Sequence, residues 1–184
     1  MKYAAFFRGI NVGGKNTVKM AELKKLFSDL GFQKVQTYIQ SGNVVFDAEE
    51  DVAHAAWKIQ KCFSAAFGFE CAVVLRTVRE MAGIIESLPF SEREIEEASS
   101  SNPAVEHLYV YLMEGSDVGE QFDGLVRAYA GRDQMRLGTN EIYLLCHESI
   151  RDSKLAASLG KLKVSLTARN WKTINKLYEM MTAE

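Results

Sequence analysis

Two short polar turns constrain the fold of this chain more than any other feature of its sequence. The turns are Ser41-Gly42-Asn43 and Gly138-Thr139-Asn140. Each lies between two short runs that are predicted to be strands, at residues 34–39 and 44–46 in the first half and at residues 133–137 and 142–146 in the second. A polar turn between two such runs is typical of a β-hairpin. Because the two turns match in position and chemistry, the sequence predicts two related halves and an internal duplication.

The pattern around the first hairpin predicts a complete α+β unit. Residues 3–7 (YAAFF) predict a buried strand, and the apolar residues within 20–30 recur at the spacing of an amphipathic helix. After the hairpin, a helix is predicted over residues 51–67 and a fourth strand over residues 71–75 (CAVVL). The order β-α-β-β-α-β is that of the ferredoxin-like arrangement.

The second half repeats this order. Strands are predicted at residues 107–113 and near 163–167, and helices at residues 117–129 and 152–159. A last helix is predicted from about residue 170 to residue 181. The predicted fold class is therefore α+β, with two related ferredoxin-like halves, antiparallel sheets and internal duplication.

A polar stretch joins the two halves. A helix predicted over residues 78–88 leads into the segment from Pro89 to Pro103, which contains SEREIEEASSSNP. Its composition favours a linker or a long surface loop. The predicted organisation is a first ferredoxin-like half at 1–88, a linker or surface loop at 89–104, and a second α+β half with a C-terminal helix at 105–184.

The overall charge and hydropathy exclude several classes of function. The net charge is −2, which argues against a general nucleic-acid or membrane-surface binder. No apolar run approaches the roughly 20 residues that a membrane span needs. The apolar start of the chain is interrupted at Arg8, too early for a secretory signal. We therefore expect a cytoplasmic protein with no membrane partner and no strong general binding of nucleic acid.

The residue types that bind metals or carry out hydrolysis are scattered. Cys62, Cys71 and Cys146 form no C-x-x-C pair, and His54 and His107 have no ligand spacing. His147 follows Cys146 directly, but adjacent strand residues face opposite sides of a sheet. The sequence predicts no metal site and no cofactor, and it does not identify a nucleophile with its base.

A glycine-rich segment, Arg8 to Asn16 (RGINVGGKN), follows the first predicted strand. Its glycines permit positive φ, and consecutive N–H groups in such a loop can converge on an anion. The spacing from Gly9 to Lys15 also fits the G-x-x-x-x-G-K of a P-loop, but Asn16 stands where Ser or Thr would bind magnesium. The alternative is a turn that lets the chain leave the strand.

A second segment, residues 167–173 (TARNWKT), opens the last predicted helix. Thr167 or Asn170 can cap that helix, and the spacing of Trp171 favours a place in the core. Arg169 and Lys172 would then lie beside the free N–H groups of the helix start, where anions bind readily.

Basic residues concentrate around these two segments. Residues 1–25 hold six Lys and Arg against one acidic residue, and residues 151–176 hold seven against one. If the two segments meet, they form one basic cleft. Ser41 and Asn43 of the first hairpin tip would line that cleft or simply form the turn. The alternative for the cations is that they decorate two ordinary helices.

Five short segments span the chain from Arg8 to about Leu177: RGINVGGKN, KMAEL, LGF, TYIQSGNVVF and TARNWKT. Together they resemble one bacterial family, the domain of unknown function 1697. The resemblance implies an α+β fold of two related halves with ferredoxin-like character. It implies no established activity, cofactor or catalytic residue.

The leading functional expectation is a binding module for an anionic, phosphate-bearing ligand such as a phosphorylated small molecule, a nucleotide or a short RNA. The expected ligand-binding residues are Arg8, Asn11, Gly13, Gly14, Lys15, Asn16, Ser41, Asn43, Arg169, Asn170 and Lys172. Two alternatives stay open. One is an enzyme acting on a phosphorylated substrate, and the other is a protein-interaction module that uses strand edges, including for a homodimer.

Overall fold

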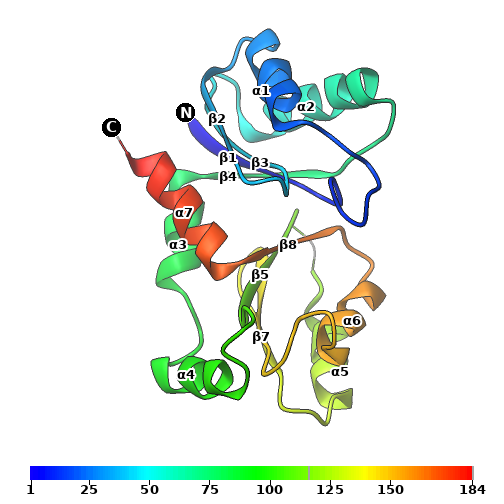
Figure 1. The fold of residues 1–184 in the computed structure, drawn as a ribbon, viewed down its shortest axis with the longest axis vertical. Helices are drawn as coiled ribbons and strands as arrows, with labels where there is room; N and C mark the ends of the chain where they lie inside the picture. Colours follow the sequence, from blue (N-terminus) through cyan, green and yellow to red (C-terminus); the bar gives the residue numbers. More distant parts are fainter. Residues whose placement is uncertain (116, 184) are drawn as a thin grey trace. The chain divides into compact units, whose positions relative to one another are not determined.

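The computed structural model describes residues 1–115 and 117–183 (Figure 1). The chain divides into two compact units. Unit 1 is Met1–Gly83 together with the residues from Asn175 on, and unit 2 is Ile84–Ile174. Helices α3 (Val78–Glu86) and α7 (Trp171–Thr182) each contain a boundary between the units.

Unit 1 is built on a four-stranded antiparallel sheet with the order β2-β3-β1-β4. Its strands are β1 (Lys2–Phe7), β2 (Gln33–Tyr38), β3 (Asn43–Asp47) and β4 (Val73–Thr77). Helices α1 (Met20–Asp29) and α2 (Val52–Phe67) lie together on one face of this sheet (Figure 1). Phenylalanines from strands and helices meet there: the Phe27 and Phe46 rings are 5.0 Å apart, and those of Phe7 and Phe63 are 5.1 Å apart.

Unit 2 repeats this topology with the strand order β6-β7-β5-β8. Its strands are β5 (Leu108–Met113), β6 (Gln134–Leu137), β7 (Glu141–Leu145) and β8 (Leu166–Asn170). Its helices α5 (Gly119–Ala128) and α6 (Lys154–Ser158) share one core with the sheet, and the 3-10 turn η1 (Leu159–Lys161) continues α6. The predicted fold class is confirmed, and the matching strand orders support the duplication.

Local signals explain where helix α2 begins and ends. The Asp51 carboxylate accepts a hydrogen bond from the His54 amide (2.8 Å) and so caps the first turn of α2. Gly68 ends the same helix in the left-handed conformation, at φ 76°.

None of the described helices is both long and apolar enough to cross a bilayer.

The polar stretch between the halves differs from the expectation. It contains helix α4 (Glu92–Ser101) rather than a linker or a surface loop over residues 89–104. Ser91 and Glu94 form a capping box, in which each side chain bonds the other residue's backbone N–H. Ala98 is fully buried, so this polar helix still packs one face. The S-x-x-E spacing of Ser91 and Glu94 is typical of a helix start, but the polar composition of the segment favours a loop.

The last strand also differs from its predicted bounds. β8 spans Leu166–Asn170, a few residues later than predicted, because it pairs with β5 in the register Val110↔Arg169. The helix that follows begins at Trp171.

Candidate functional site

The glycine-rich loop forms a miniature hairpin at the surface of unit 1. Val12 and Lys15 form an isolated antiparallel bridge, and the Lys15 amide donates to the Val12 carbonyl (3.1 Å). Gly13 and Gly14, at φ 60° and 74°, are the two central residues of its turn. A two-residue hairpin turn of this kind needs positive φ at both central positions, which explains the glycine pair without any ligand.

The side chain of Asn11 anchors this loop to the rest of the unit. Its amide nitrogen donates to the carbonyls of Val18 (2.9 Å) and Gln40 (2.8 Å), and its oxygen accepts from the Val18 amide (2.8 Å). These bonds join the base of the loop to the start of the path into α1 and to the β2–β3 hairpin tip. Asn11 itself lies at φ 56°, a conformation that asparagine tolerates better than most residues.

The tip of the β2–β3 hairpin packs directly under the loop. Gly42 is buried at φ 77°, and an added Cβ would lie 2.5 Å from Ile10 Cδ1 and 2.9 Å from Phe7 Cβ. The Asn43 side chain is fully buried and donates to the Tyr38 carbonyl (3.1 Å) and to Ser41 Oγ (2.9 Å). The structure therefore brings together the two predicted segments of unit 1, Arg8 to Asn16 and Ser41 to Asn43.

The polar groups of the loop differ in their exposure and in their partners. Asn11 and Asn43 have backbone partners, and Asn16 donates to the Gly9 carbonyl (3.4 Å). Arg8 and Lys15 are exposed, and within the described residues Lys15 has no carboxylate within 4.0 Å. The Gly13 and Gly14 amides donate no hydrogen bond in the same part of the chain.

The second predicted segment belongs to unit 2, and its polar groups have partners there. The Arg169 guanidinium is buried and donates to the Ala168 carbonyl (2.7 Å). Asn170 Oδ1 accepts from the Thr173 amide (2.9 Å) and thereby caps α7. Lys172 Nζ lies 2.6 Å from a carboxylate oxygen of Glu106. The segment thus supplies a cap and an ion pair to its own unit.

Comparisons with known proteins agree with this architecture. A family model described as a protein of unknown function (DUF1697) matches residues 1–143. The chain belongs to this family. Among solved structures, it is similar to the conserved bacterial protein SP0830 from Streptococcus pneumoniae, with 29% identity, 98% of each chain covered and a TM-score of 0.74. A search of curated proteins gave no match.

The region that matches the DUF1697 model contains both segments that pack together in unit 1. The TARNWKT segment lies beyond its last matched residue. Of the two segments predicted to bind a ligand, the glycine-rich loop is therefore the one within the matched part of the chain.

Two buried arginines occupy equivalent positions in the two units, and only one was predicted as a site residue. Arg76 on β4 pairs with Ala4 of β1, as Arg169 on β8 pairs with Val110 of β5. Arg76 also donates to the carbonyl of the residue before it, Leu75 (2.9 Å). Both halves of the sequence contain a single cation within an apolar strand that is followed by a helix. This shared pattern could have identified both arginines.

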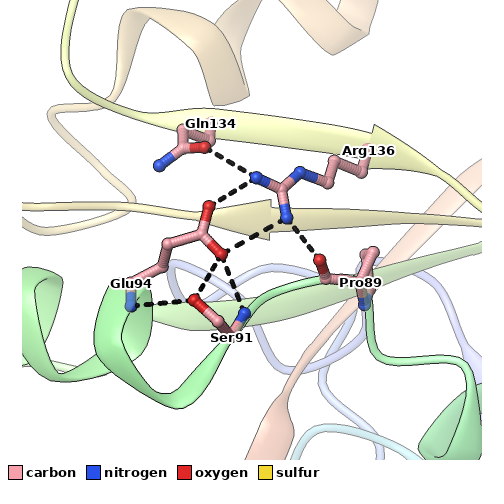
Figure 2. Close-up of polar contacts among 5 residues, drawn as sticks. All are labelled: Pro89, Ser91, Glu94, Gln134 and Arg136. Carbon is pink, nitrogen blue, oxygen red and sulfur yellow. Dashed lines mark hydrogen bonds and ion pairs between the residues drawn. The ribbon is translucent and has the colours of Figure 1, made fainter.

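A partly buried polar network in unit 2 was not predicted from the sequence (Figure 2). Arg136 on β6 donates to both carboxylate oxygens of Glu94, to the Pro89 carbonyl and to Gln134 Oε1 (3.1 Å). Hydrogen bonding from Arg136, and then from Ser91, lowers the pKa of Glu94 from 4.5 to about 2. The guanidinium also lies 4.4 Å from the centre of the Phe90 ring. These contacts hold the start of α4 against the edge strand, so their evident role is structural.

Unit 2 also gathers an Asp, a His and a Ser, the residue types of a hydrolase triad, in the wrong order. Ser153 Oγ donates to Asp133 Oδ2 (2.6 Å), and His147 Nδ1 lies 3.8 Å from the other oxygen of the same carboxylate. The carboxylate therefore lies where the histidine base should be. Burial raises the pKa of the neighbouring Cys146 thiol to about 12, which keeps it protonated and a poor nucleophile. This cluster resembles a buried structural network, not a nucleophile with its base.

Proposed function

We propose that this DUF1697 protein is a binding module for an anionic, phosphate-bearing ligand, such as a nucleotide or a short RNA, held at the glycine-rich loop of unit 1. One observation carries the proposal. The loop is fixed from below by Asn11 and Gly42, yet its two cations, Arg8 and Lys15, are exposed at the surface.

The physical argument is preorganisation. A loop whose backbone is already fixed loses little conformational entropy when a ligand binds. Positive φ at Gly9 and Asn11 alternates with negative φ at Ile10 and Val12, a pattern that anion-binding backbone concavities share. In this proposal the Gly13 and Gly14 amides donate to phosphate oxygens and Lys15 supplies a point charge. Arg8 adds bidentate hydrogen bonds.

The remaining predicted residues take supporting roles in this proposal. Asn11, Asn16, Ser41 and Asn43 would position the loop rather than contact the ligand, because each has a hydrogen-bond partner within unit 1. The proposal does not depend on Arg169, Asn170 and Lys172, which have partners in unit 2.

The test is a binding screen on the full chain with ATP, AMP, inorganic pyrophosphate and a short single-stranded RNA. A ligand that binds the folded state raises Tm, and titration calorimetry then gives its Kd. We expect Arg8→Gln and Lys15→Gln each to weaken binding about tenfold, because each removes a charged contact to phosphate. The matched control is Lys24→Gln, the same charge change on an exposed residue of α1.

Two results would reject the proposal. One is that none of these anions stabilises the wild-type chain more than the Arg8→Gln, Lys15→Gln double variant. The other is that Lys24→Gln weakens binding as much as Lys15→Gln does, which would indicate general charge attraction and no site.

A protein-interaction module is the second candidate, and one observation favours it. Val12 at the loop tip is 64% exposed and Ile39 beside the hairpin tip is 51% exposed, although most large apolar side chains are buried. If this end of unit 1 binds a protein, Val12→Asn and Ile39→Asn will abolish the association and leave nucleotide binding unchanged. Light scattering on the purified chain separates self-association from binding of a different partner.

A further inference from the structure

A hollow within unit 2 is lined by apolar residues at the C-terminal end of α5 and by two lysines of the α6–η1 segment, called here its apolar floor and its basic rim. It lies between the C-terminal end of α5 and the α6–η1 segment and encloses about 480 Å³. Leu125, Ala128 and the Tyr129 ring contribute its apolar surface. Its polar lining comes from Lys154, Ser158 and Lys161. The hollow thus joins the two chemistries that an amphipathic ligand needs.

The two lysines are placed to act on one ligand. Lys154 and Lys161 are seven positions apart on a continuous helical segment, so their side chains leave the same face two turns apart. Within the described residues neither has a carboxylate within 4.0 Å, and no carboxylate lines the hollow. Ser158 Oγ already donates to the Leu155 carbonyl (2.7 Å), so the cations are the groups left to bind an anion.

Unit 1 supplies an internal comparison, because it has a hollow at the C-terminal end of its own first helix. That hollow also reaches the second helix, but its lining includes Asp47, Glu49 and Glu50. The one lysine that lines it, Lys58, is held by Glu50 at 2.7 Å. The fold therefore permits either charge at this place. The basic rim is a property of the unit 2 sequence rather than of the architecture.

We propose that the unit 2 hollow binds a small phosphomonoester whose organic part is apolar or aromatic. The phosphate lies between Lys154 and Lys161, and the organic part packs on Leu125, Ala128 and Tyr129. Two cations match the dianion of a phosphate monoester, whereas a carboxylate needs one. Burial of the organic part on the apolar floor adds the hydrophobic contribution to binding. The site lies in a different unit from the glycine-rich loop and does not rest on the function proposed there.

The geometry of Tyr129 depends on the glycine next to the hollow. A Cβ at Gly131 would lie 2.1 Å from the Tyr129 hydroxyl oxygen, so the ring keeps its position only with glycine there. That hydroxyl accepts a hydrogen bond from the Asp133 amide (3.4 Å), which helps to hold the ring in place. Gly131→Ala is therefore a way to disturb the apolar floor without changing any charge.

The experiment is a calorimetric titration of the full chain with phenyl phosphate, inorganic phosphate, benzoate and phenol. We expect phenyl phosphate to bind most tightly of the four, because it alone offers the dianion and the apolar ring together. The Lys154→Gln, Lys161→Gln double variant should weaken phenyl phosphate binding at least about tenfold. Lys163→Gln, the same charge change on a nearby exposed residue outside the hollow, should change it by less than about twofold.

Other variants separate this site from the proposed loop site and from loss of fold. In the Arg8→Gln, Lys15→Gln background, which removes the cations of the loop site, Lys154→Gln together with Lys161→Gln should still weaken phenyl phosphate binding at least about tenfold. Gly131→Ala should weaken binding of phenyl phosphate more than that of inorganic phosphate. Urea denaturation confirms that each variant stays folded. The proposal is overturned if the wild-type chain does not bind phenyl phosphate at millimolar concentration. It is also overturned if the double lysine variant binds it as tightly as the wild type does.

Discussion

The two units share a strand order but treat the connection after their first strand differently. In unit 1 the chain from β1 to α1 runs over residues 8–19, whereas in unit 2 the chain from β5 to α5 runs only over residues 114–118. The long connection holds the glycine-rich hairpin, and the short one leads almost directly into its helix. Because a duplicated scaffold fixes the strands and frees the loops to diverge, function is best sought where the copies differ.

The hairpin tips reflect the same difference. The Phe7 amide donates to the Gly42 carbonyl (2.9 Å) in unit 1, and the Met113 amide donates to the Asn140 carbonyl (3.1 Å) in unit 2. Gly42 and Asn140 are therefore structurally equivalent. This alignment is shifted by one residue from the alignment of the two turn sequences, which places Asn43 opposite Asn140. Unit 2 has an asparagine at this position. Unit 1 has a glycine there, because Ile10 packs closely against it.

Gly42→Ala should have the largest effect on stability of any change considered. The new Cβ would meet Phe7 and Ile10 at under 3.0 Å and would also force alanine to φ 77°. We expect a loss of about 2–4 kcal/mol in the free energy of unfolding, measured by urea denaturation. Gly68→Ala is the matched control, because its φ is 76° and nothing lies within 4 Å of the added Cβ. Equal losses for the two variants would mean that close packing under the loop contributes nothing.

Asn11→Ala should have the next largest effect, because it leaves the Val18 amide and two carbonyls without their partner. Unpaired groups at a partly buried site cost about 1–3 kcal/mol in the free energy of unfolding. Asn11→Gly removes the same bonds but tolerates φ 56°, so it isolates the hydrogen-bond contribution. Hydrogen exchange should show faster opening of residues 9–18 in both variants. Protection of that loop at the wild-type level would contradict the anchoring role.

Most of the fold could be predicted because its signals are local. The helix over residues 52–67 has its Asp51 cap and Gly68 stop in the sequence, and the hairpin at residues 33–47 has its turn. Helix α4 was missed although the Ser91–Glu94 spacing was available, because a polar helix with one buried alanine shows almost no apolar stripe.

The roles of the candidate site residues were harder to predict, because they depend on contacts distant in sequence. Asn11 bonds the Gln40 carbonyl and Lys172 pairs with Glu106, and neither partner follows from residue type or spacing. The sequence pointed to the polar residues of the glycine-rich loop as candidates. It could not show that asparagine holds the loop while arginine and lysine stay exposed.

A smaller effect is expected from the caps of the second helix in each unit. Asp51 caps α2, which is 16 residues long, and Ser153 caps the 5-residue α6 while also donating to Asp133. Asp51→Ala should cost about 1 kcal/mol, the usual value of an N-cap. Ser153→Ala should cost more, since it also breaks a buried charged hydrogen bond. Urea midpoints decide the order, and a greater loss at Asp51 would show that the Asp133 contact contributes little.

The smallest effect should come from the partly exposed Glu94–Arg136 pair, which has a clear dependence on pH. The pKa of Glu94 falls from 4.5 to about 2 on folding. The contribution of ionised Glu94 to the free energy of unfolding is therefore fully present above its ordinary pKa of 4.5. That contribution is lost as the pH falls from about 4.5 to about 2, because the proton then binds the folded carboxylate as well. Glu94→Gln should therefore lower the urea midpoint at pH 6 and have little effect once the pH is below about 2. The loss should appear in hydrogen exchange at α4 and β6 but not in the sheet of unit 1, since Arg136, Ser91 and Pro89 all belong to unit 2. An equal loss of protection in both sheets would show that the two units unfold together. The units would then differ in sequence but not in their local stability.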